Sequence, residues 1–65
     1  MKTDLVSYGQ GIYQLKILNS NESFMIEWDD ECLYRVTLLE NEEAVEDMGS
    51  FESKADAIKY IKTLY

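Results

Sequence analysis

Three consecutive short runs of this chain alternate apolar with polar residues, and only its C-terminal end changes to a helical spacing. The runs cover residues 12–18, 24–29 and 32–39. A period of two is typical of a strand that buries one face. The segments Asn19–Glu22 and Asp29–Glu31 separate the runs, and both have the composition of turns. The sequence therefore predicts three antiparallel strands joined by short turns.

Two flanking segments are less regular. Residues 1–11 end in Gly9-Gln10-Gly11, a turn signal, so we expect an N-terminal arm or a short edge strand there. Residues 44–48 alternate weakly before Gly49-Ser50, which makes them a candidate fourth strand.

The C-terminal segment predicts a helix over residues 53–64. Ser53 can cap its first turn, and Asp56 carries the negative charge that suits a helix N-terminus. Phe51, two residues before the cap, is expected to fold back onto the helix. Apolar side chains recur at helical spacing, namely at Ala55, Ala57, Ile58, Ile61 and Leu64.

Together these elements predict an α+β fold and a single domain over residues 1–65. A three- to four-stranded meander over residues 12–48 would pack one face on the helix. The expected inward residues are Tyr13, Leu15, Ile17, Phe24, Ile26, Trp28, Tyr34, Val36, Leu38, Phe51, Ile58, Ile61 and Leu64. Cys32 is expected on the same core face, as a structural and unreactive thiol. The other face would leave Met25, Leu33 and Leu39 partly exposed.

Several chemistries lack their residues. The chain has no His and one Cys, so an intrachain disulfide, a Cys/His zinc site and a His-activated nucleophile are excluded. The acidic residues lack the spacing of a calcium loop, and Gly9-Gln10-Gly11 precedes a strand rather than the helix of a phosphate loop. We therefore expect no catalytic residue, no metal and no cofactor, and a protein that is not an enzyme.

The charge balance indicates a class of partner. Thirteen acidic residues against six basic ones give a net charge of −7, which disfavours nucleic acid and anionic membranes and favours a basic protein. The same charge also serves solubility. No apolar run approaches the ~20 residues of a membrane span, and the N-terminus lacks the apolar core of a signal peptide. With a lone thiol, these features predict a cytoplasmic protein.

The acidic residues are unevenly distributed. Nine of the thirteen lie between Glu27 and Asp47, where Arg35 is the only base. Closely spaced carboxylates imitate the phosphates of DNA, which carries one charge per ~1.7 Å of duplex axis. The candidate protein-binding acids are Glu27, Asp29, Asp30, Glu31, Glu42, Glu43 and Glu46. Tyrosine is enriched at binding hot spots, which adds Tyr8, Tyr60 and Tyr65 as candidates.

In size, acidity and lack of catalytic residues, the chain resembles the very small acidic proteins of phages and mobile elements, some of which block host nucleases by DNA mimicry. The resemblance implies an inhibitor or modulator that docks on a basic, nucleic-acid-binding protein. A second hypothesis is a small structural or accessory domain that acts through homodimerisation, with the acidity serving solubility. It follows from the thin core of so short a chain, which has no disulfide or metal to stabilise it.

Overall fold

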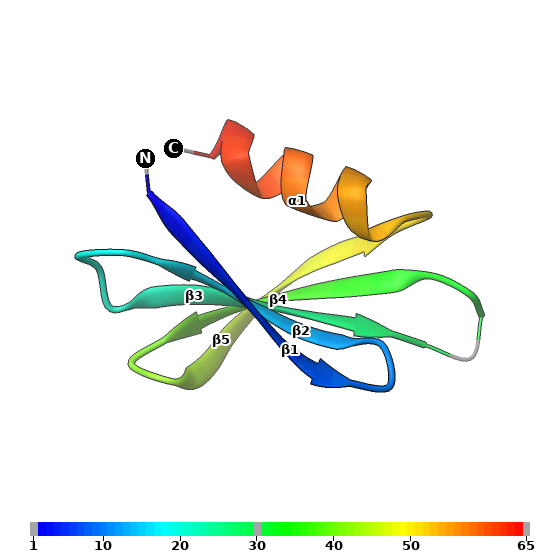
Figure 1. The fold of residues 1–65 in the computed structure, drawn as a ribbon, viewed down its shortest axis with the longest axis horizontal. Helices are drawn as coiled ribbons and strands as arrows, with labels where there is room; N and C mark the ends of the chain where they lie inside the picture. The colour runs from blue at the N-terminus through cyan, green and yellow to red at the C-terminus, as the bar shows by residue number, and fades with distance from the viewer. Residues whose placement is uncertain (1, 30, 65) are drawn as a thin grey trace.

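The part of the chain that the structure describes forms five antiparallel strands and one C-terminal helix (Figure 1). The computed structural model describes residues 2–29 and 31–64. Its elements are β1 (Thr3–Gly9), β2 (Ile12–Ile17), β3 (Glu22–Trp28), β4 (Tyr34–Glu40), β5 (Glu43–Phe51) and α1 (Lys54–Thr63). Each strand pairs with the next in sequence, so the sheet is a meander whose edges are β1 and β5. The strands fan out around a common crossing, which is the usual twist of a sheet (Figure 1).

The α+β class is confirmed, and the number of strands is five rather than three to four. The N-terminal segment is a full edge strand that pairs with β2 from Thr3 opposite Ile17 to Gly9 opposite Ile12. The weakly alternating segment 44–48 lies inside β5. Both added strands are sheet edges whose residues are mostly exposed, and so neither shows the alternation of a half-buried strand.

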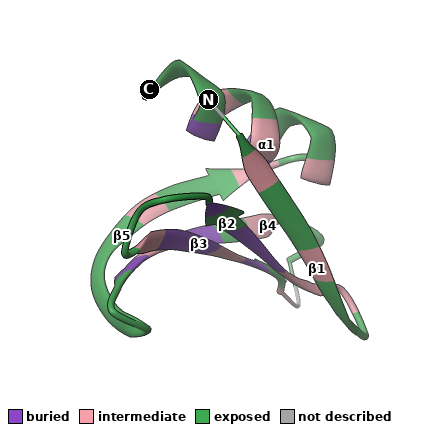
Figure 2. Cartoon of the chain, turned by 60° about the vertical axis from the view of Figure 1, so that its left-hand side comes forward, coloured by how far each residue is buried: buried purple, intermediate pink, exposed green. Residues whose placement is uncertain are grey.

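The hydrophobic core lies between the sheet and α1, which packs on β3, β4 and β5 (Figure 2). Most of the predicted inward residues are confirmed. The buried members of the core are Leu15, Ile17, Phe24, Ile26, Val36, Ala57 and Ile61. Partly buried side chains pack around them, namely Tyr13, Tyr34, Leu38, Met48, Phe51 and Ile58.

Ser53 caps the N-terminus of the helix, as the sequence predicts. The Ser53 hydroxyl accepts a hydrogen bond from the Asp56 amide at 3.1 Å, and Leu64 is the C-terminal cap. Such an N-cap contributes about 1 kcal/mol to helix stability. Phe51 does fold back onto the helix, with its ring 5.0 Å from that of Tyr60. Leu64, however, is exposed and does not belong to the core.

The prediction that Trp28 is buried under the helix is wrong, because its side chain is 50% exposed. Trp28 is the last residue of β3, and its Cβ lies next to Gly11 in the β1–β2 turn. A Cβ added to Gly11 would lie 2.8 Å from the Trp28 Cβ, and Gly11 has φ of +79°. Glycine at position 11 therefore serves both the turn conformation and the close approach of Trp28.

Cys32 is also misplaced by the sequence prediction. It lies in the β3–β4 turn with φ of 63°, and its thiol is exposed. The turn is longer than the residues 29–31 predicted for it, because Asp29 Oδ1 accepts hydrogen bonds from the amides of Glu31 and Leu33, at 2.9 and 3.0 Å. β4 consequently begins at Tyr34 rather than at Cys32.

The sheet face opposite the helix is more buried than expected. Leu39 is buried rather than partly exposed, while Met25 and Leu33 are half-buried as predicted. Gln14, only 3% exposed, accepts a hydrogen bond from the Tyr8 hydroxyl at 2.6 Å. Its amide nitrogen donates to Ser23 Oγ at 3.0 Å and to Glu42 Oε2 at 3.2 Å. This network ties the edge strand β1 and the β4–β5 turn to the middle of the sheet.

Candidate docking surface

One end of the sheet gathers acidic residues from three strands. Glu22 of β3 lies directly opposite Glu40 of β4, which in turn lies opposite Glu43 of β5. Directly opposed residues on a sheet have Cβ atoms about 5 Å apart, so the three glutamates form one cross-strand row. With the neighbouring acids of the β4–β5 turn and of β5, they make up what we call the acidic end: Glu22, Glu40, Glu42, Glu43, Glu46 and Asp47.

The β4–β5 turn explains how Glu40 and Glu43 come to face each other. Asn41 and Glu42, between the strands, both have positive φ, 53° and 67°. A two-residue turn of this kind matches the twist of the flanking strands and pairs the residues on either side of it. The Glu42 carboxylate is then free to turn towards Gln14, from which it accepts its hydrogen bond.

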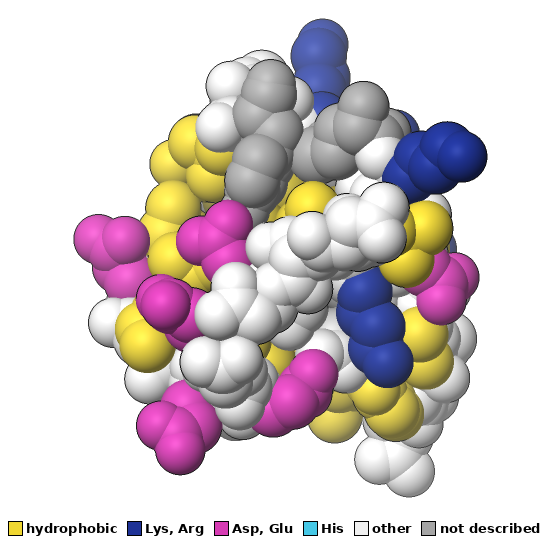
Figure 3. Space-filling view, turned by 90° about the vertical axis from the view of Figure 1, so that its left-hand side faces the viewer, with side chains coloured by type: hydrophobic (Ala, Val, Ile, Leu, Met, Phe, Trp, Pro, Cys, Tyr) yellow, Lys and Arg dark blue, Asp and Glu magenta, His cyan; other side chains and the backbone are white. Residues whose placement is uncertain are grey.

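Charges are segregated on this side of the molecule. Viewed from this end, most acidic side chains gather on the left and below, and Lys and Arg side chains lie at the top and right, where acidic side chains also appear (Figure 3). β5 carries Glu43, Glu46 and Asp47 and no basic residue, and their side chains are exposed. An acidic field of this kind attracts a basic surface over several ångströms of approach.

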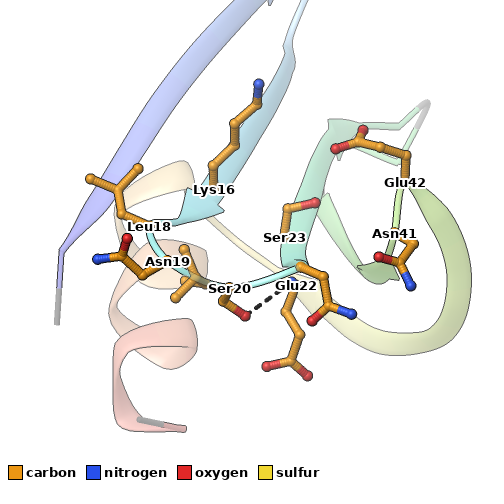
Figure 4. A pocket seen from close by; sticks show the side chains of 10 residues that line it. Lys16, Leu18, Asn19, Ser20, Glu22, Ser23, Asn41 and Glu42 are labelled. Carbon is orange, nitrogen blue, oxygen red and sulfur yellow. Dashed lines mark hydrogen bonds between the residues drawn. The ribbon is translucent and has the colours of Figure 1, made fainter.

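A depression of about 490 Å³ opens between the β2–β3 and β4–β5 turns. Lys16, Ser23 and Glu42 line it on the face opposite the helix, whereas the Glu22 carboxylate points away from them (Figure 4). The dashed bond there joins the Glu22 amide to Ser20 Oγ at 3.1 Å and shapes the β2–β3 turn. Glu22 and Glu42 of the acidic end therefore both border the depression.

The remaining predicted acids that the structure describes lie at the other end of the sheet. Asp29 and Glu31 belong to the β3–β4 turn, and Glu27 is directly opposite Arg35 on the face away from the helix. Glu46, by contrast, is opposite the core residue Leu38 on the helix side. Glu27 and Glu46 therefore lie on different faces and do not join the two ends into one stripe. The predicted site residue Asp30 lies outside the described residues.

The two candidate tyrosines that the structure describes have different surroundings. Tyr8 is 56% exposed on edge strand β1, although its hydroxyl is engaged by Gln14. Tyr60 is half-buried against Phe51, which gives it a packing role. Tyr65 lies outside the described residues. Of Tyr8 and Tyr60, Tyr8 offers the more exposed aromatic surface for a contact.

Three members of the acidic end were not among the predicted site residues: Glu22, Glu40 and Asp47. Glu22 stands apart from the other acids in the sequence, and only the pairing of β3 with β4 brings it opposite Glu40. The signal was present in the lengths of the two strands, because a meander with short turns places the start of β3 beside the end of β4.

Comparisons of the chain with protein-family models, with curated proteins and with solved structures found no match. Within residues 2–29 and 31–64, no group of three potential ligands is arranged to hold a metal ion. The helix of the described part is too short and too polar to cross a membrane.

Proposed function

We propose that this chain is a non-enzymatic protein-binding module that docks its acidic end on a basic surface of another protein and thereby inhibits or modulates it. The partner surface is one that otherwise binds nucleic acid, so that the carboxylates occupy places normally taken by phosphates. This partner class rests on the charge and on the resemblance to small acidic inhibitors.

The cross-strand row of Glu22, Glu40 and Glu43 is the observation that carries the proposal. Like charges directly opposite each other on a sheet destabilise it, whereas opposite charges stabilise it. If the acidity served solubility alone, net charge would be sufficient, and three glutamates would not need to lie in one row. A basic partner relieves the repulsion between the exposed, directly opposed Glu40 and Glu43, and the relief adds to the binding free energy.

A pair of charge-matched variants tests the proposal. The acidic-end variant carries Glu22→Gln, Glu40→Gln, Glu43→Gln and Glu46→Gln. The control carries Asp4→Asn, Glu27→Gln, Glu31→Gln and Glu52→Gln, four exposed acids outside the acidic end. Both variants lose the same amount of charge, so a difference between them reports position and not net charge.

Wild type and both variants are immobilised and exposed to lysate of the native host, with and without competing double-stranded DNA. We expect wild type and the control to retain the same basic protein, which DNA displaces, and the acidic-end variant to lose it. The acidic-end variant should unfold at the same denaturant concentration as wild type or at a higher one, because repulsion has been removed. Equal capture by all three proteins at low salt would refute the proposal.

A further inference from the structure

The two edges of the sheet differ in how well they are protected against pairing with another strand. An edge strand offers unpaired N–H and C=O groups, and natural proteins protect such edges with charges, bulges and twists. β5 has both kinds of protection. It carries three acidic residues, and its pairing with β4 shifts register twice, between Val36 and Thr37 and between Leu38 and Leu39.

The centre of β1 carries neither charged residues nor a register shift. Residues 5–8 are Leu-Val-Ser-Tyr, uncharged and rich in the residue types that strands favour. Its one register shift lies at its end, between Ser7 and Gly9. Leu5 is 41% exposed, and α1 packs mainly on β3, β4 and β5. β1 is thus an edge strand with regular pairing along its centre, and it carries the partly exposed apolar side chain of Leu5.

The hydrogen bonding of β1 shows which of its backbone groups are unpaired within the sheet. The Lys2 carbonyl accepts from the Leu18 amide at 3.0 Å, so Lys2 faces β2. In an antiparallel ladder, alternate residues face the partner strand. Asp4 and Val6 then also face β2, while the N–H and C=O groups of Thr3, Leu5 and Ser7 point to the open edge.

We propose that β1 is a self-association edge that pairs antiparallel with β1 of a second copy, with Leu5 opposite Leu5. In this register Thr3 lies opposite Ser7 of the second copy. The backbone N–H and C=O groups of Thr3, Leu5 and Ser7 in each strand then all form hydrogen bonds with the other copy. The two Leu5 side chains meet on the helix side of the joined sheet. Asp4 lies opposite Val6 of the second copy, and Lys2 lies opposite Tyr8 of the second copy. No like charges are therefore directly opposed.

A second copy is the occupant that the charges favour. Pairing β5 with β5 would bring acidic residues against acidic residues, and pairing β1 with β1 brings none together. The dimer would be a continuous sheet with both helices on one face. Both acidic β5 edges remain free at its outer ends, so the inference does not depend on what the acidic end binds.

Mass measurements on edge variants test the proposal. By light scattering at high micromolar concentration we expect a dimer for wild type and a monomer for Leu5→Lys. Two lysines directly opposite each other should raise the dimer dissociation constant at least about tenfold. The matched control is Val45→Lys, which places the same charge at a 54% exposed residue of the other edge and should leave the dimer intact.

A backbone variant separates edge pairing from side-chain effects. Ser7→Pro removes an N–H that points to the open edge, together with an exposed hydroxyl that accepts from the Gly9 amide at 3.4 Å. It should keep the protomer folded by circular dichroism and still dissociate the dimer. In wild type, the Leu5 amide should exchange with solvent more slowly as the concentration rises. A monomeric wild type, or a dimer that survives both β1 variants, would overturn the proposal.

Discussion

The substitution Phe24→Ala is expected to leave the chain largely unfolded at 25 °C. Phe24 is 1% exposed and is among the largest fully buried side chains of the core. Removing a buried phenylalanine side chain typically costs about 3–5 kcal/mol. A single core of this size supplies roughly the same amount in total. The loss of one ring therefore consumes most of the folding free energy.

Urea unfolding followed by circular dichroism measures this effect. Leu18→Ala is the control, because Leu18 is 45% exposed and its truncation should shift the transition only slightly. Both proteins should be measured at low concentration, where self-association adds little stability. A cooperative transition for Phe24→Ala close to that of wild type would mean that the core does not depend on this side chain.

The substitution Gln14→Leu is expected to destabilise the fold by about 1–3 kcal/mol, although leucine is apolar and of similar size. It removes the partner of Ser23, whose side chain is buried and then lacks its hydrogen bond from Gln14. It also removes the acceptor of Tyr8 and the donor to Glu42. The cost comes from leaving a buried polar group unsatisfied.

The double substitution Gln14→Leu with Ser23→Ala provides the control. Replacing both partners of a buried hydrogen bond by apolar groups is often nearly neutral. The double variant should therefore be more stable than Gln14→Leu alone in urea or thermal unfolding. Additive losses from the two substitutions would contradict a coupled network at this position.

The half-buried strands and the helix could be predicted from the sequence because burial imposes a period on them. Phe24 and Ile26 follow the period of a strand with one buried face, and Ala57 and Ile61 follow that of a helix. Ser53 caps the helix through contacts within one turn, so a local signal was sufficient.

Edges and ends of the sheet could not be predicted in the same way. β1 and β5 are mostly exposed, and their pairing depends on neighbours distant in sequence. Trp28 continues the inward alternation of β3, yet the helix does not bury it at the strand end. The sequence analysis placed Cys32 in a strand, whereas it lies in the β3–β4 turn. The hydrogen bond from the Leu33 amide to Asp29 Oδ1 extends this turn, and such a bond produces no periodic pattern in the sequence.

The acidic end was predicted in part. Glu42, Glu43 and Glu46 belong to it, since they are neighbours in the sequence. The register of the sheet added Glu22 and Glu40 and separated Glu27 from the group. The face of Glu46 could not be predicted, because a register shift of one residue exchanges the two faces of a strand and the pairing of β4 with β5 contains two such shifts.

The most direct test of the docking proposal is the affinity of the chain for its captured partner as a function of salt. Exposed charges are screened over about 10 Å at 0.1 M salt, and over less as the salt concentration rises. If the acidic end makes the contact, the dissociation constant should rise at least about tenfold between low and high salt. The acidic-end variant should have a flatter dependence than the charge-matched control. An affinity that stays constant or tightens with salt would show an apolar contact and contradict the account.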